Sequence, residues 1–192
     1  MNPKQLAGEK AAEFIRSGMI VGLGTGSTAY WAIQKIGSMV KEGLQISAVA
    51  TSQQSEALAR EWQIPLVAFA DIDHIDIDID GADEVDAQLN LIKGGGGALL
   101  REKIVAANSR RFIVVADESK FVQALGRFPL PVEVVPFAWE LTFRQLEQIG
   151  ASPALRKING QIFRTDNGNY IADLALGSIP DPGQLQQQIR HI

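Results

Sequence analysis

Residues 19–29 read MIVGLGTGSTA, and this stretch decides the fold class. Its apolar first half, 19–23, predicts a short buried strand, and the GTGST segment predicts a loop. Apolar residues then recur at helical spacing, at Ala29, Ile33 and Ile36. A strand, a glycine-rich loop and a helix in this order predict the start of a βαβ unit.

The alternation of strands and helices continues to residue 116. Further apolar and β-branched runs predict strands at 46–50, 65–69, 75–80, 89–93 and 112–116. Helical spacing predicts helices at 6–15, 55–62 and 99–107. Strands that alternate with helices predict an α/β domain with a parallel, helix-covered sheet.

The order of elements changes after the proline-rich segment 128–136, FPLPVEVVP, which predicts a crossing between two structural units. Beyond it we expect strands at 132–135, 155–158 and 170–174, a helix at 139–149 and a helix after Pro182. The TDNG segment at 165–168 is a hairpin signal. The sequence therefore predicts domains at 1–130 and 131–192, the second a split β-α-β-β-α unit without a last strand.

The composition excludes several function classes. The chain has no Cys, which excludes disulfides and thiol catalysis and favours a cytoplasmic location, and its two His leave little for a metal site or a catalytic triad. Eight of the 22 acidic residues lie between Asp71 and Asp86, and no basic stripe favours nucleic acid as a partner. No apolar run reaches the ~18 residues of a membrane helix, and the polar start MNPKQLAGEK is unlike a signal peptide.

The GTGST segment is a candidate phosphate site, because backbone N–H groups at a helix N-terminus can hold an anion. Gly24-x-Gly26-x-x-Ala29 also fits a relaxed dinucleotide fingerprint, which needs an acidic residue about 20 positions later. That place is occupied by Ala50, Thr51 and Ser52, so a small phosphate ester is the better ligand. The alternative interpretation is that the segment is a glycine turn that only connects the strand to the helix and binds no ligand.

The segment 76–84, DIDIDGADE, alternates aspartate and isoleucine, which predicts a strand with one acidic face. Its opening resembles a calcium loop, but the residue where a bidentate Glu is required is Ala87. A solvated acidic edge would explain Asp76 and Asp78. It explains Asp80 and Asp83 less well, since they flank Gly81 where the strand ends, and ligands of parallel sheets gather at such ends.

The third stretch, 93–102, reads KGGGGALLRE and again predicts a strand, a glycine loop and a helix. Glu102 lies about one turn into that helix, where it is either a catalytic base or a surface residue. Lys120, in the ADESK segment, follows the strand that ends at 116. A carboxylate base beside a cation suits proton abstraction next to a carbonyl. The residues alone therefore favour a cofactor-free isomerase or lyase that acts on a sugar phosphate.

Five blocks together resemble one family, the type A ribose-5-phosphate isomerases. The blocks are GLGTGSTA, DIDGADEVD, LIKGGGGALLREKIVA, ADESK and FPLPVEVVP. The resemblance implies a Rossmann-like domain with a small α+β lid, in a dimer or a dimer of dimers. It also implies interconversion of D-ribose 5-phosphate and D-ribulose 5-phosphate through an enediolate, without cofactor or metal, in the non-oxidative pentose phosphate pathway.

The resemblance also implies a role for each matching residue. Glu102 corresponds to the catalytic base, Lys93 to the residue that polarises the carbonyl, and Asp80 and Asp83 to residues that assist ring opening and proton movement. The substrate-binding positions are Thr25, Gly26, Ser27, Thr28, Asp80, Gly81, Ala82, Asp83, Lys93, Gly94, Gly95, Gly96 and Lys120.

Two other functions stay open beside the isomerase. A sugar-phosphate-binding module would have the same fold without turnover, and a sugar-phosphate deaminase would release ammonia. The resemblance further implies two strands beyond residue 192 that the sequence does not contain, so we expect an unpaired edge in the lid.

Overall fold

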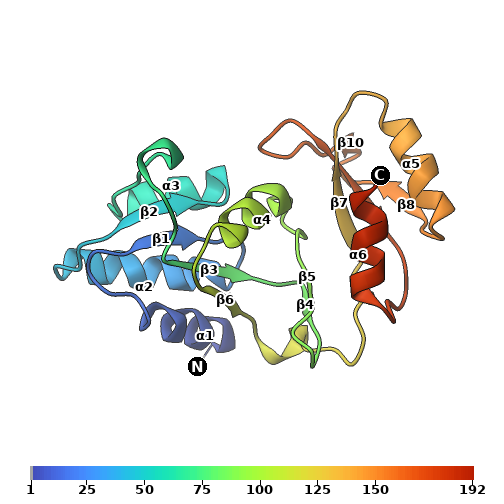
Figure 1. Ribbon diagram of the computed structural model, residues 1–192. Helices are drawn as coiled ribbons and strands as arrows, with labels where there is room; N and C mark the ends of the chain where they lie inside the picture. Colours follow the sequence, from blue (N-terminus) through green and yellow to red (C-terminus); the bar gives the residue numbers. More distant parts are fainter. Residues whose placement is uncertain (1) are drawn as a thin grey trace. The chain divides into compact units, whose positions relative to one another are not determined.

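The computed structural model describes residues 2–192 (Figure 1). These residues form two compact units, each described here by itself. Of the described residues, unit 1 contains 2–81 and Leu100–Glu118, and unit 2 contains Ala82–Leu99 and Ser119–Ile192. This division by contacts differs from the domains 1–130 and 131–192, which stay a sequence-based prediction. No helix of residues 2–192 is long and apolar enough to cross a membrane.

Unit 1 is built on a four-stranded parallel sheet, which confirms the predicted fold class. The strands lie in the order β2 (Ser47–Ala50), β1 (Ile20–Leu23), β3 (Ile77–Gly81) and β6 (Phe112–Val115). Because the chain leaves β1 toward one edge and then crosses back to β3, the strand order reverses between β1 and β3. Ligands of such sheets bind at this switch point, at the carboxyl ends of the strands.

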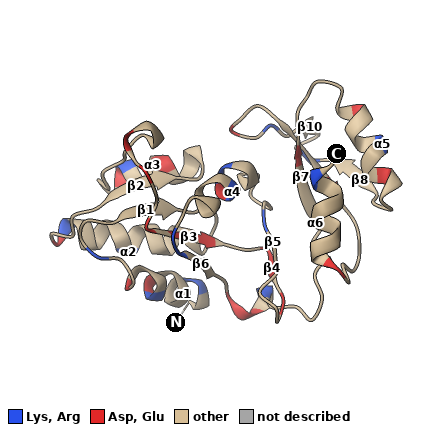
Figure 2. Cartoon of the chain, viewed as in Figure 1, with Lys and Arg blue, Asp and Glu red and all other residues tan. Residues whose placement is uncertain are grey.

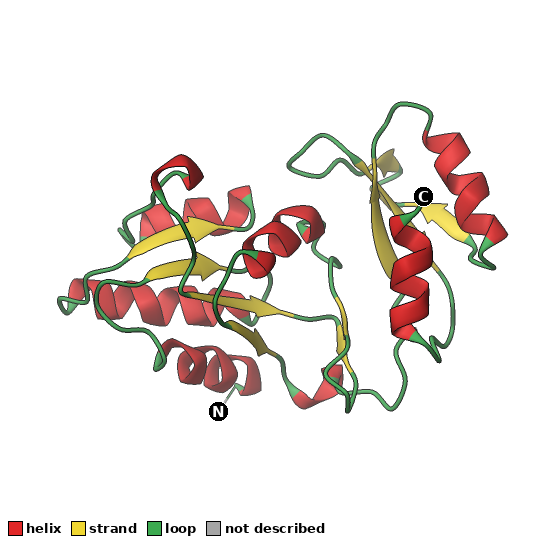
Figure 3. Cartoon of the chain, viewed as in Figure 1, coloured by secondary structure: helices red, strands yellow, loops and turns green. Residues whose placement is uncertain are grey.

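Helices cover both faces of this sheet (Figures 1 and 3). The helices α1 (Pro3–Ala12), α2 (Ala29–Lys41) and α3 (Gln53–Glu61) lie along one face, where α2 packs against both α1 and α3, and α4 (Leu99–Ala107) lies along the other. The largest buried side chains of the first face include Leu23, Ile33 and Ile36, which belong to one apolar core. Their burial supplies the driving force that holds the sheet and these helices together.

The alternating strand β3 is buried on both faces. Ile77 and Ile79 belong to the apolar core, as the alternation predicts. Asp78, however, is fully buried, and so is Asp80. Figure 2 colours the acidic residues of the chain red. An ideal Cβ on Gly22 would lie 2.8 Å from Val105 of α4 and 2.6 Å from Asp78, so this aspartate lies on the α4 side. The solvated-edge interpretation of Asp78 is therefore wrong, because α4 covers that face.

Two predicted strands of the parallel sheet are not there. The stretch 65–69 makes only an isolated bridge from Leu66 to Ala48 and continues into a 3₁₀ turn, η1 (Phe69–Asp71). The stretch 89–93 forms β5 (Leu91–Ile92), which pairs antiparallel with β4 (Glu84–Val85) in unit 2. Short apolar runs alone do not tell a parallel strand from one arm of a hairpin.

The larger part of unit 2 is an antiparallel three-stranded sheet in the order β7 (Leu130–Val134), β11 (Tyr170–Leu174) and β8 (Pro153–Leu155). The helix α5 (Trp139–Gln148) follows β7, and α6 (Pro182–Arg190) follows β11. Leu146 and Leu174 are fully buried in the core between these elements. This agrees with the predicted β-α-β-β-α order, to which the structure adds a hairpin of β9 (Lys157–Ile158) and β10 (Gln161–Ile162).

Candidate active site

The loop after β1 approaches β3 at the switch point of the sheet. The N–H of Gly24 donates to the carbonyl of Ile79 at 2.9 Å, and a Cβ on Gly24 would lie 2.4 Å from the Cα of Asp80. Only glycine permits that approach. The N–H of Thr25 then donates to Oδ1 of Asp80 at 2.9 Å. The structure therefore brings two predicted site residues, Thr25 and Asp80, into direct contact.

The backbone at the N-terminus of α2 has a geometry that suits the binding of an anion. Gly26 has a φ of +105°, and Gly26 and Ser27 are exposed. Thr28, the N-cap, makes no capping hydrogen bond with its side chain. Among residues 2–192, no backbone carbonyl accepts a bond from the N–H groups of 26–29. These groups and the positive end of the helix dipole favour a bound anion.

Lys4 adds a positive charge to this loop, and sequence reasoning missed it. Its Nζ donates to Oγ of Ser27 at 2.9 Å, across 23 positions of the chain. Lys4 lies in the first turn of α1, and α1 packs against α2. No local pattern in the sequence indicates this contact, because it depends on how two helices pack.

The two carboxylates of unit 1 in the predicted site are both buried. Oδ1 of Asp80 accepts from Thr25 and also from the N–H of Gly81 at 2.7 Å. Glu102 lies in the first turn of α4 and is 4% exposed. The surface interpretation of Glu102 is therefore wrong. A buried carboxylate whose negative charge is favoured by a helix N-terminus is suited to accept a proton from a bound molecule.

In unit 2, Asp83 contacts the second glycine loop. Its backbone N–H donates to the carbonyl of Ile92 at 2.8 Å, and its Oδ2 accepts from the N–H of Gly95 at 2.7 Å. Lys93, half-buried, follows β5 and begins this loop. The predicted residues Asp83, Lys93 and Gly95 are thus held together by direct contacts and by chain continuity.

Arg156 supports the same loop and was also missed. Its guanidinium donates to the carbonyls of Gly94 at 3.1 Å and Gly95 at 2.9 Å, and it forms a bidentate pair with Asp173. Its side chain is 13% exposed. Such a fork of donors fixes both carbonyls in one orientation. The partners lie 61 and 62 positions away in the chain, so no sequence spacing predicts the contact.

Four further residues of the predicted site lie at the ends of other elements or in the second glycine loop. Gly81 ends β3, and Ala82 begins unit 2. Gly96 is exposed within the second glycine loop, and Lys120 is half-buried at the end of the 3₁₀ turn η2 (Glu118–Lys120).

Two other acidic residues of this region have structural roles. The side chain of Glu84 accepts from the N–H groups of Gly126 at 2.8 Å and Phe128 at 2.6 Å. Asp86 closes the turn between β4 and β5, and its pKa lies below the ordinary value because the side-chain amide of Asn90 donates to it. Of residues 2–192, no three His, Asp or Glu side chains are arranged to hold a metal ion.

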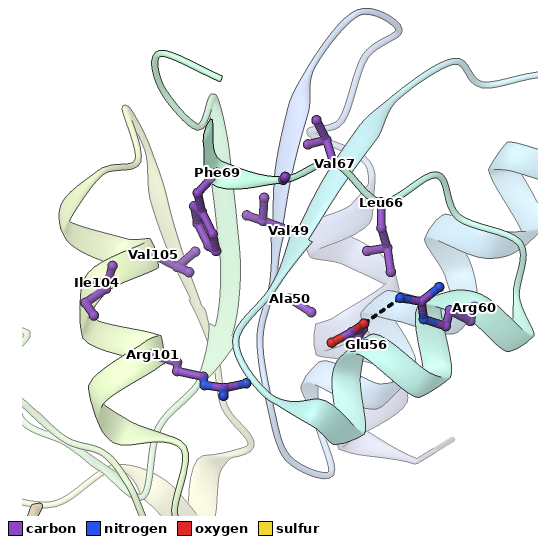
Figure 4. Close-up of a pocket in the computed structure, with 11 residues that line it drawn as sticks. Val49, Ala50, Glu56, Arg60, Leu66, Val67, Phe69, Arg101, Ile104 and Val105 are labelled. Atoms are coloured by element: carbon purple, nitrogen blue, oxygen red, sulfur yellow. Dashed lines mark hydrogen bonds and ion pairs between the residues drawn. The ribbon is translucent and has the colours of Figure 1, made fainter. Parts of the chain in front are cut away.

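A separate pocket of about 570 Å³ opens on unit 1 between α3 and α4 (Figure 4). Its lining is largely apolar, and Arg101 points into it opposite an ion pair of 2.6 Å between Glu56 and Arg60. None of the predicted site residues lines this pocket. The pocket is therefore a feature of the surface separate from the two glycine loops that carry the predicted site residues.

Comparisons with known proteins agree on one family. The profile of ribose 5-phosphate isomerase A (phosphoriboisomerase A) matches residues 47–192. The chain is 52% identical to ribose-5-phosphate isomerase A of Bacillus mycoides, over 100% of this chain and 87% of the relative. It is 53% identical to the Streptococcus sanguinis protein of the same name, over 100% of this chain and 85% of the relative.

Solved structures give the same result. A D-ribose-5-phosphate isomerase in complex with phospho-erythronic acid is 41% identical with a TM-score of 0.95, covering 100% of this chain and 87% of that one. The Methanocaldococcus jannaschii enzyme is 39% identical with a TM-score of 0.94, covering 100% and 86%. Fold, motif order and identity over the whole chain therefore agree: this chain belongs to the ribose 5-phosphate isomerase A family.

Proposed function

We propose that this chain interconverts D-ribose 5-phosphate and D-ribulose 5-phosphate by moving a proton between C2 and C1 through an enediolate. The observation that carries this proposal is Glu102, a carboxylate that is 4% exposed in the first turn of α4. A surface residue would not be buried there, whereas a base that must meet a C–H proton is best kept from bulk water. The family supports the choice of substrate.

The phosphate group is assigned to the N-terminus of α2. Gly26, Ser27 and Thr28 offer backbone N–H groups, Ser27 and Thr28 add hydroxyls, and Thr25 begins the loop. Lys4 contributes a cation to Ser27. Neutral donors at a helix N-terminus together with one ammonium suit a dianionic phosphate ester.

The remaining roles follow from charge. Glu102 takes the proton from C2 of the aldose and returns it to C1, and Lys93 stabilises the oxyanion that develops as the carbonyl becomes an enediolate. Asp80 and Asp83 accept hydrogen bonds from sugar hydroxyls, assist ring opening and move the hydroxyl proton from O2 to O1, so that the C2 hydroxyl becomes the new carbonyl as the C1 carbonyl becomes a hydroxyl. The N–H groups near Gly81, Ala82, Gly94 and Gly96, and the ammonium of Lys120, contribute to substrate binding. The reaction as proposed needs no metal or cofactor.

The test is isomerisation of ribose 5-phosphate by the purified chain, with a chelator present and with Glu102→Gln and Glu56→Gln measured alongside. Glu56 is a half-buried partner of Arg60 outside the proposed site, so its variant is the control. We expect Glu102→Gln to lower kcat by about 10²–10⁴-fold and Glu56→Gln to leave it unchanged. Wild-type turnover by Glu102→Gln would show that Glu102 is not the base.

A binding module without turnover predicts a different result. The wild-type chain would then bind phospho-erythronic acid but exchange no proton between ribose 5-phosphate and solvent.

We also propose that the enzyme is a cytoplasmic homodimer, as the family resemblance implies. Sedimentation equilibrium would give the mass of the assembly, and a monomeric mass would contradict the dimer.

A further inference from the structure

Four hydroxyl groups meet beneath the loop that follows β1. Oγ1 of Thr25 lies 2.8 Å from Oγ1 of Thr51, 2.8 Å from Oγ of Ser52 and 3.0 Å from Oγ of Ser55. Ser52 and Ser55 are 2.7 Å apart. Thr51, Ser52 and Ser55 are all at most 4% exposed, and we refer to these four residues as the hydroxyl cluster.

The hydroxyl cluster joins three segments of unit 1. Thr51 and Ser52 follow β2, Ser52 is the N-cap of α3, and Ser55 lies in the first turn of that helix. The cluster also binds the two carbonyls before Thr25, since Thr51 donates to Leu23 at 3.0 Å and Ser55 donates to Gly24 at 2.9 Å. The carbonyls of Leu23 and Gly24 and the hydroxyl of Thr25 are thus held by side chains that follow β2 and begin α3.

The hydroxyl of Thr25 is directed toward the rest of the hydroxyl cluster. Thr25 donates to Ser52, whose Oγ also accepts from the N–H of Ser55 at 3.0 Å. The N–H of Thr25 is engaged as well, by Asp80. Both donors of Thr25 therefore point into unit 1. The donors that remain for an anion are those of Gly26, Ser27 and Thr28, whose directions depend on how Thr25 is fixed.

We propose that Thr51, Ser52 and Ser55 are positioning residues for the phosphate group, which act by holding Thr25 so that the N–H groups of the next three residues converge on the anion. This inference rests on the proposed function, in which those groups bind the substrate phosphate. Neutral hydroxyls fit the role because, beside the Asp80 carboxylate that accepts from the N–H of Thr25, they fix the loop without a further carboxylate that would repel the phosphate or a cation that would compete for it. They also preorganise donors that would otherwise lose entropy on binding.

Thr51→Val tests the proposal, because valine keeps the shape of threonine and removes the hydroxyl. We expect KM for ribose 5-phosphate and the Kd for inorganic phosphate to rise about five- to tenfold, while kcat changes less than about twofold. Thr51→Ser restores the hydroxyl and should restore both constants. Ser55→Ala should behave as Thr51→Val does, and it should fold readily since alanine favours helices.

The control is Ser109→Ala, which removes another hydroxyl of unit 1, one that donates to the carbonyl of Val105 at 2.8 Å away from the loop. Urea unfolding of each variant separates positioning from stability. Unchanged phosphate affinity in folded Thr51→Val and Ser55→Ala, or an equal loss in Ser109→Ala, would overturn the proposal. Phosphate binding is measured without turnover, so an inactive wild type whose phosphate affinity still depends on Thr51 would refute the isomerase and leave the positioning role supported.

Discussion

The chain places two glycine loops before helices and holds them by different chemistry. The loop at 24–28 is anchored by neutral hydroxyls and by one buried aspartate, Asp80. The loop at 94–97 is anchored by the guanidinium of Arg156 and the carboxylate of Asp83. The first set of anchors comes from β3 and from the segment between β2 and α3 of unit 1, and the second comes from two segments of unit 2 that lie 12 and 61–62 positions from the loop.

The difference lies in which backbone groups each anchor uses. In the first loop, the cluster binds the carbonyls of Leu23 and Gly24, and the N–H groups of 26–29 stay available. In the second loop, Gly95 donates to Asp83, and the N–H of Gly97 donates to the carbonyl of Gly94 at 2.9 Å. A loop that binds an anion must keep its N–H groups unused, whereas a loop that carries a lysine needs only a fixed backbone.

The largest expected effect is a difference in stability between Gly97→Ala and Gly26→Ala. Both glycines have positive φ, +84° and +105°, so both variants are strained by about 1–3 kcal/mol. Only Gly97 is also crowded, since its Cβ would lie 2.5 Å from the ring of Phe163, while Gly26 has open space. We expect Gly97→Ala to lose about 1–3 kcal/mol more in the free energy of urea unfolding.

Phe163→Leu in the Gly97→Ala background is the matched test of that crowding. The smaller side chain should recover part of the loss, and Phe163→Leu with Gly26→Ala should recover nothing. Equal destabilisation by the two alanine variants would mean that the second loop is no more constrained by packing than the first.

A smaller effect is expected from Arg156→Met, which keeps the length of the side chain and removes its donors. The carbonyls of Gly94 and Gly95 then lose their shared partner, so the position of Lys93 becomes less well defined. We expect kcat for ribose 5-phosphate to fall about tenfold with KM changed less, because a misplaced group weakens the transition state most. Steady-state kinetics measure both constants.

The control for Arg156 is Arg164→Met, an exposed arginine of the same unit that donates to the carbonyl of Gly168 at 3.0 Å. Its removal should leave kcat unchanged. Arg156→Met could instead raise KM and leave kcat unchanged. That result would mean that the loop at 94–97 binds substrate, as the loop at 24–28 is proposed to do. It would contradict the proposed difference, in which only the loop at 94–97 serves to position Lys93.

The same contrast explains what the sequence could predict. The bounds of α4 and β11 agree with the helix expected at about 99–107 and the strand expected near 170–174, because local sequence signals mark both elements. The strand, loop and helix around Gly24 followed from the same local signals. The burial of Glu102 and Asp78 could not be predicted, because it depends on which face α4 covers.

Contacts between distant segments escaped sequence analysis. Thr51, Ser52 and Ser55 look like an ordinary helix start, and only the pairing of β1 with β2 places them under Thr25. Arg156 lies between β8 and β9 with no motif around it. The motif residues themselves were identified by resemblance, and their roles in catalysis are predictions that kinetics must decide.

The smallest expected effect concerns a second charged anchor of unit 1, the carboxylate of Asp76 at the amino end of β3. Oδ2 of Asp76 accepts from the N–H of Ile20 at 2.8 Å, and this bond chiefly holds the pKa of Asp76 below its ordinary value of 3.8, with contributions from His74 and Arg110. Because the folded pKa is lowered, the stabilisation is complete above the unfolded pKa and is lost as pH falls through the folded one. Asp76→Asn should therefore lower the free energy of unfolding by less than about 1 kcal/mol at pH 7, and the difference from wild type should vanish in strong acid.

Phosphate affinity at pH 7 should not change, since Asp76 lies at the opposite end of β3 from the hydroxyl cluster. A variant that weakened phosphate binding would instead show that a charge at one end of the sheet affects the loop at 24–28 at the other end.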